Sequence, residues 1–199
     1  IQPSSNPDVL TIAGDISDRS IAERIVNEAI AHFGRVDTLV NNAGNFTAKP
    51  FTAFTTEDYA RTLAVNLDGF FHITQFAIAE MVKQGSGHVV SITTTLAVHA
   101  IDGVPALLAA LTKGVLNAAT KSLAIEYAKE HIRFNAVAPG IVDTPMHTNE
   151  SKDFLKTLSP MGTISSITDI AEAVVYLARA RNVTGEVLHV DGGAHQGRC

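Results

Sequence analysis

Two asparagines, an alanine and a glycine stand together as Asn41-Asn42-Ala43-Gly44, directly after the apolar end of a short segment at residues 37–40. In open parallel α/β sheets, ligands bind beyond the carboxyl ends of the strands. The amides supply hydrogen-bond donors and acceptors, and the glycine admits a ligand close to the backbone. This pattern predicts a strand end that binds a flat polar ligand, although the same residues also suit an ordinary turn.

Asn66 and Lys113 are polar residues inside segments that are otherwise apolar and helical in spacing. A buried amide requires hydrogen-bond partners, so Asn66 is either a functional residue or a satisfied amide of the core. Most lysines lie on helix surfaces in water, and that alternative stays open for Lys113. The neighbours of Lys113 argue against it, because they are Ala109, Ala110, Leu111, Val115 and Leu116.

The composition indicates one globular domain over residues 1–199, because 46% of the residues are apolar and 18% are charged. A net charge of −5 provides no basic surface for nucleic acid or for an anionic membrane. No apolar run approaches the ~20 residues that cross a bilayer. The one cysteine, Cys199, excludes an internal disulfide and fits a reducing compartment, so we expect a cytoplasmic protein. The eight histidines have no metal-ligand spacing, and we expect no metal site.

Segments typical of strands alternate along the chain with segments of helical spacing. The expected strands are residues 9–13, 36–40, 88–92, 132–137 and 186–190. The expected helices are residues 20–33, which begin with a capping box at Ser20, and residues 55–83, 105–131 and 167–180. This alternation predicts a doubly wound α/β fold, with a parallel sheet and helices on both faces.

Several short motifs, in this order and at these spacings, resemble those of the short-chain dehydrogenase/reductase family over residues 15–193. They are Asp15-Ile16, Asn41-Asn42-Ala43-Gly44, Val65-Asn66-Leu67, Leu111-Thr112-Lys113-Gly114, the run from Asn135 to Thr144, and the glycines from Gly185 to Gly193. The resemblance implies a Rossmann-type fold. It also implies hydride transfer between NAD or NADP and a small carbonyl or alcohol substrate.

The resemblance assigns roles to individual residues. It implies that Asp15 and Ile16 lie beside the adenine, although Asp15 also suits a helix cap. The cofactor-binding residues that it implies are Asn42, Ala43, Gly44 and Lys113 at the ribose, and Pro139, Gly140, Val142 and Thr144 at the carboxamide and phosphate. It implies that residues 141–166 form a substrate lid with an apolar inner face, although the segment also suits an ordinary mobile loop. It further implies a homodimer or homotetramer formed through helices 56–83 and 105–128, although the apolar helix 105–128 also suits burial within one subunit.

The catalytic residues that the resemblance implies are Asn66, Thr94 and Lys113, but the family tyrosine is replaced. That tyrosine stands four residues before the lysine, where this chain has Ala109; the three tyrosines, Tyr59, Tyr127 and Tyr176, stand elsewhere. Thr94 takes the place of the family serine. His99 or Asp102 is a candidate substitute acid, or both are exposed loop residues. We therefore expect an oxidoreductase with a non-standard proton donor, or a catalytically silent dinucleotide-binding or oligomeric interaction protein.

The glycine-rich turn of the family is also missing before Asp15. We expect the first strand–helix–strand unit of the family to be absent from this chain. Without that unit, residues 9–12 either pair directly with residues 36–40 or lose their strand. The same glycines bring a backbone close to the pyrophosphate, so we expect this chain not to bind a dinucleotide tightly.

Overall fold

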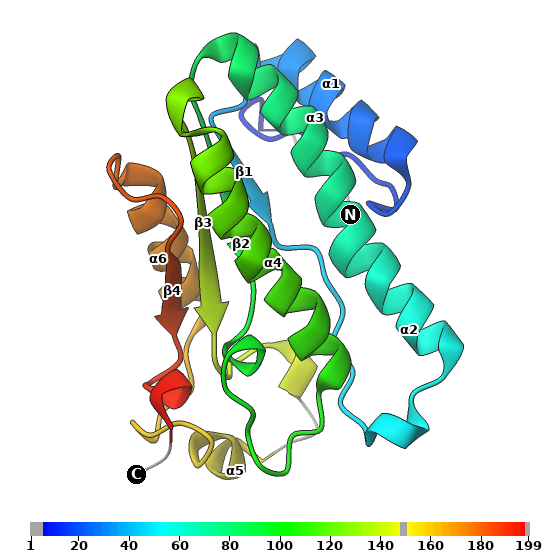
Figure 1. Cartoon of the computed structure of the whole chain (residues 1–199), viewed down its shortest axis with the longest axis vertical. Helices are drawn as coiled ribbons and strands as arrows, with labels where there is room; N and C mark the ends of the chain where they lie inside the picture. The colour runs from blue at the N-terminus through cyan, green and yellow to red at the C-terminus, as the bar shows by residue number, and fades with distance from the viewer. Residues whose placement is uncertain (1–5, 148–150, 198–199) are drawn as a thin grey trace.

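A computed structural model of the chain describes residues 6–147 and 151–197 (Figure 1). Four parallel strands form one sheet in the order β1-β2-β3-β4. They are β1 (Thr38–Asn41), β2 (Gly87–Ile92), β3 (Ile132–Pro139) and β4 (Val187–Val190). The register pairs Val40 with Val90 and Val90 with Asn135, so the carboxyl ends of the first three strands meet at one edge. The predicted parallel α/β sheet is confirmed.

Helices cover both faces of this sheet (Figure 1). They are α1 (Arg19–Phe33), α2 (Thr56–Leu63), α3 (Gly69–Gln84), α4 (Leu107–Glu126), α5 (Lys152–Lys156) and α6 (Ile167–Arg179). Val89 and Val90 show the two faces, because successive strand residues point in opposite directions. Val89 belongs to the core formed with α1, α3 and α4, and Val90 to the core formed with α6. The fold is therefore doubly wound, as the alternating pattern predicts.

The prediction of a strand at residues 9–13 is wrong. These residues are irregular, and Val9 is 48% exposed. The outer edge of β1 has no paired strand in the part of the chain that the structure describes. Of the two outcomes expected for residues 9–12, pairing with residues 36–40 or loss of the strand, the structure shows the loss. A strand needs a hydrogen-bonded neighbour, and its own apolar pattern does not supply one.

Two helix ends also differ from prediction. α1 begins at Arg19 after the N-cap Asp18, whose carboxylate accepts hydrogen bonds from the backbone N–H and the hydroxyl of Ser20. Ser20 therefore donates to the cap and is not the cap itself. α4 ends at Glu126, and a 3₁₀ turn then leads to His131, whose φ of 57° lies in the left-handed region.

The helix predicted from residue 55 to residue 83 is present but contains a π-helical turn. α2 begins after a capping box between Thr55 and Asp58, and α3 continues it to Gln84. Between them, Ala64–Asp68 form the π-helical turn, and Asn66 lies at its centre. Such turns are often found at functional sites, because they re-aim a side chain without ending the helix. Within the described residues, no helix is long and apolar enough to cross a membrane.

Candidate active site

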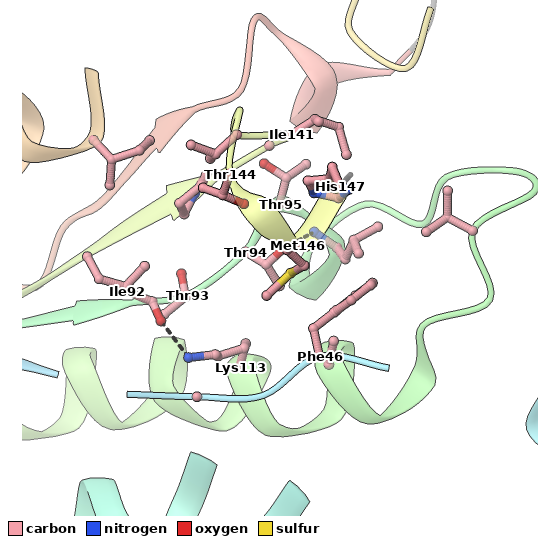
Figure 2. A pocket seen from close by; sticks show the side chains of 18 of the residues that line it. Phe46, Ile92, Thr93, Thr94, Thr95, Lys113, Ile141, Thr144, Met146 and His147 are labelled. Atoms are coloured by element: carbon pink, nitrogen blue, oxygen red, sulfur yellow. Dashed lines mark hydrogen bonds between the residues drawn. The ribbon is translucent and has the colours of Figure 1, made fainter. Parts of the chain in front are cut away.

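A cavity of about 810 Å³ lies at the carboxyl ends of β1, β2 and β3 (Figure 2). The loop after β1 contributes Asn42, Gly44 and Phe46, and the loop after β2 contributes Thr94 and its neighbours. Pro139 ends β3, Gly140, Val142 and Thr144 follow it, and α4 adds Ala109 and Lys113. Segments distant in the sequence therefore share one cavity, because their strands end side by side.

Lys113 points from α4 toward the end of β2, and Figure 2 shows its amine beside the backbone of Ile92. Nζ donates a hydrogen bond of 2.8 Å to the carbonyl oxygen of Ile92. In the described parts of the chain, the amine forms no ion pair with a carboxylate. Burial therefore lowers the pKa of Lys113 to about 8, because the charged form loses water without gaining an opposite charge.

Gly44 provides the space that this amine occupies. A Cβ at position 44 would lie 3.1 Å from Lys113 Nζ and 3.2 Å from Asn66 Oδ1, closer than ordinary van der Waals contact. The absence of a side chain lets the β1 loop pass close to both polar groups. The packing of the site, and not a turn with positive φ, therefore favours glycine at this position.

Asn66 connects the β1 loop to α4 from behind the cavity. Its side chain is 1% exposed, and Oδ1 accepts from the Asn45 N–H at 2.9 Å. Nδ2 donates to the Asn45 carbonyl oxygen at 3.2 Å and to Thr112 Oγ1 at 3.0 Å. Thr112 Oγ1 in turn donates to the Leu108 carbonyl oxygen at 2.8 Å. Asn66 thereby holds the loop of Gly44 against the turn of α4 that carries Lys113.

The loop that carries Thr94 is anchored to the end of β4. The hydroxyl of the next residue, Thr95, donates a 2.6 Å hydrogen bond to the buried carboxylate of Asp191. Gly140 lets the chain after β3 lie against Asp191, because a Cβ at that position would lie 2.8 Å from the Asp191 Cβ. Thr94 Oγ1 accepts from the Leu96 N–H at 3.3 Å, which leaves its own proton available for another acceptor.

The structure brings together most of the residues predicted for the site, but not all of them. Those that line the cavity are Asn42, Gly44, Thr94, Lys113, Pro139, Gly140, Val142 and Thr144. Asp15, Ile16, Ala43 and Asn66 do not line it. Asp15 accepts from the backbone N–H and the hydroxyl of Ser17, and Ile16 packs against Gly69 and the core under α1 and α3.

His99 and Asp102 line a second, smaller cavity of about 200 Å³ together with Leu158 and Ala194. Neither residue lines the cavity that contains Lys113. Ala109 does line that cavity, one helical turn before Lys113, and it presents only a methyl group. A proton from His99 or Asp102 would require movement of the loop that carries them.

Most of the remaining wall is apolar, and sequence reasoning missed much of it. Phe46, Ile101 and Val104 come from loops, and Ile170 and Val174 come from α6. The helical spacing on α6 indicates a buried face but not that this face borders a cavity. Residues 141–166 also contribute apolar and polar side chains, namely Met146, His147, Phe154, Leu155 and Leu158. Residues 148–150 of this segment lie outside the described residues.

Comparison with known proteins identifies the family. A family model described as "Enoyl-(Acyl carrier protein) reductase" matches residues 2–195. A tropinone reductase homolog of Arabidopsis thaliana is 36% identical over 191 residues, which are 94% of this chain and 70% of the relative. A solved variant of a Serratia marcescens short-chain dehydrogenase/reductase has a TM-score of 0.86 and 35% identity, over 94% of this chain and 76% of that one. The chain belongs to the short-chain dehydrogenase/reductase family.

A second solved member of the short-chain dehydrogenase/reductase family supports the assignment as an oxidoreductase. The 3-ketoacyl-(acyl-carrier-protein) reductase from Brucella melitensis, complexed with NADH, has a TM-score of 0.87 and 32% identity, over 94% of this chain and 78% of that one. Residues 6–147 and 151–197 contain no group of three or more potential metal ligands.

Proposed function

We propose that this chain is a reductase that transfers hydride between a nicotinamide dinucleotide and an apolar aldehyde or ketone. The observation that supports it is the shared cavity, in which Lys113 and Thr94 lie among apolar side chains at the carboxyl ends of the strands. Open α/β sheets bind dinucleotides at this edge.

The residues of the cavity fit the nicotinamide end of such a cofactor. Gly44 leaves room beside the Lys113 amine, and the amide of Asn42 lies on the same loop. We propose that Lys113 and Asn42 hold ribose hydroxyls, and that the segment from Pro139 to Thr144 holds the carboxamide. A bound nicotinamide dinucleotide would supply or accept the hydride. The predicted contacts of Asp15, Ile16 and Ala43 with the adenine and the ribose remain predictions.

We assign the proton of the reaction to Lys113 and the orientation of the carbonyl oxygen to Thr94. A general acid works best when its pKa lies near the working pH, and burial lowers the pKa of Lys113 to about 8. The Thr94 hydroxyl keeps a proton that it can donate to the carbonyl oxygen. We prefer Lys113 to His99 and Asp102, because those two side chains line the neighbouring cavity. Asn66 acts through Asn45 and Thr112 as a positioning residue.

The test is oxidation of NADH and of NADPH by this chain in the presence of benzaldehyde or cyclohexanone. We expect turnover by the native chain and its loss in Lys113→Met. We also expect Ala109→Tyr, which restores the family's phenol one turn before Lys113, to raise the rate by about 10²–10⁴-fold, the usual contribution of general acid catalysis. No turnover by the native chain and none by Ala109→Tyr would instead favour the catalytically silent binding protein.

We also propose that the outer surfaces of α3 and α4 dock against a second copy of the chain. Phe71 on α3 is 57% exposed, and Leu111, Val115 and Ile125 on α4 are exposed as well. The two helices lie on one side of the sheet (Figure 1). Sedimentation velocity should show a dimer or tetramer that Leu111→Lys dissociates. The matched control, Tyr176→Lys, alters an exposed residue of α6 on the opposite face and should leave the assembly intact.

A further inference from the structure

The environment of the Lys113 amine makes its neutral, nucleophilic form more abundant than in an ordinary lysine. An ammonium group has three N–H donors, and the described residues give this one a single acceptor, the carbonyl oxygen of Ile92. No described carboxylate lies within ion-pair distance of it. A lysine that is desolvated in this way is the kind that attacks carbonyl carbons in proteins.

The space in front of the amine suits an apolar carbonyl compound. Phe46, Ile101, Val104, Met146 and Phe154 line the cavity, whose volume of about 810 Å³ falls in the range of small-molecule sites. Ala109, one turn before Lys113, presents a methyl group, so the side chain at this position cannot donate a proton to the amine. Entry of an apolar aldehyde would exclude water further and increase the neutral fraction of the amine.

We propose that Lys113 is a carbonyl-capturing amine that forms an imine with neutral, apolar aldehydes and ketones in this cavity. The nitrogen lone pair forms the N–C bond to the carbonyl carbon, the C=O π bond breaks, and one N–H proton passes from the nitrogen to the carbonyl oxygen to give a neutral carbinolamine, whose remaining N–H proton later leaves with the hydroxyl as water. Loss of water breaks the C–O bond and leaves the C=N bond of the imine. The reaction consumes no oxidant or reductant, and water returns the free lysine and the carbonyl compound.

This activity goes beyond the proposed hydride transfer and does not depend on a dinucleotide. Both use the same nitrogen, so at any moment Lys113 serves one or the other. The cavity brings an apolar carbonyl compound next to the amine, and the lowered pKa makes Lys113 more reactive than the other lysines. At about pH 7.5, an amine with a pKa of about 8 is roughly one quarter neutral, whereas a lysine at the ordinary value of about 10.4 is roughly 0.1% neutral, a difference of about 200-fold.

Reductive trapping tests the proposal on the full chain without any dinucleotide. The chain is incubated with benzaldehyde and sodium cyanoborohydride, which reduces an imine to a stable benzyl-lysine, and the modified lysines are mapped by peptide mass spectrometry. We expect Lys113 to be labelled first, with half-maximal labelling near pH 8. Lys113→Met should abolish this modification, and Lys121→Met, at an exposed position of the same helix, should leave it unchanged. Glyceraldehyde, which is polar, should label Lys113 less than benzaldehyde does.

Equal labelling of all lysines, or labelling of Lys113 only at the high pH of ordinary lysines, would overturn the proposal. If Lys113→Met fails to fold, the pH dependence of Lys113 labelling in the native chain still tests the proposal. The oxidation of NADH and NADPH is measured on the same preparation. Labelling without turnover by either the native chain or Ala109→Tyr refutes the proposed reductase and leaves the capturing amine. Turnover without labelling refutes the capturing amine and leaves the reductase.

Discussion

Replacing Asn66 with alanine should destabilise this fold far more than replacing another buried asparagine. Asn66 is 1% exposed and forms three hydrogen bonds, two with the backbone of Asn45 and one with Thr112. At a net value of about 0.5–1.5 kcal/mol for each bond, Asn66→Ala should lower the free energy of unfolding by about 2–4 kcal/mol. Thr112 keeps its bond to Leu108, and Asn45 is partly exposed, so we expect no additional penalty for stranded groups.

Asn117 provides the matched control. It is 9% exposed and lies on α4, but its buried Oδ1 has no hydrogen-bond partner in the described structure. Asn117→Ala should therefore lower the free energy of unfolding by less than about 1 kcal/mol, since a polar atom that gains nothing from burial is removed. Urea unfolding followed by far-ultraviolet circular dichroism measures both variants at neutral pH. A difference between the two variants below about 0.5 kcal/mol would refute the assigned role of Asn66.

Two further predictions concern a buried histidine and a partly buried arginine. Burial, together with the charge of Arg133, lowers the pKa of His88 from 6.5 to about 4. The contribution of His88 to the free energy of unfolding should therefore be fully present above pH 6.5 and fall as the pH drops toward 4. The loss should total about 3 kcal/mol, and His88→Gln should remove most of it in urea unfolding measured between these pH values. Arg133 donates to carbonyl oxygens of Leu177 and Ala178, and of Ala180 and Val183 just beyond the end of α6. Arg133→Met should therefore lower the melting temperature, with a loss of about 3 kcal/mol in the free energy of unfolding. Arg133→Lys, which keeps the charge, should lose less. An unchanged melting temperature for Arg133→Met would contradict this prediction.

Local sequence predicts the regular elements of this fold well, because their signals are short-range. The apolar run at residues 88–92 and the helical spacing at residues 167–180 are found at β2 and α6 with ends shifted by at most one residue. The helix start predicted at residue 55 also agrees with the N-cap of α2 at Thr55. The first predicted strand fails, because residues 9–13 have the pattern of a strand but no neighbouring strand to bond with.

The sequence by itself determined which residues stand at the ends of strands, and therefore that Asn42, Thr94 and Pro139 would share one edge of the sheet. Only the tertiary structure decided where the long-range groups would lie. It turned Asn66 toward Asn45 and away from the cavity, placed His99 and Asp102 in a separate hollow, and left Lys113 with a single carbonyl acceptor. The physical reason is that strand ends follow from local pattern and topology, whereas burial and hydrogen-bond partners depend on contacts between residues distant in the chain.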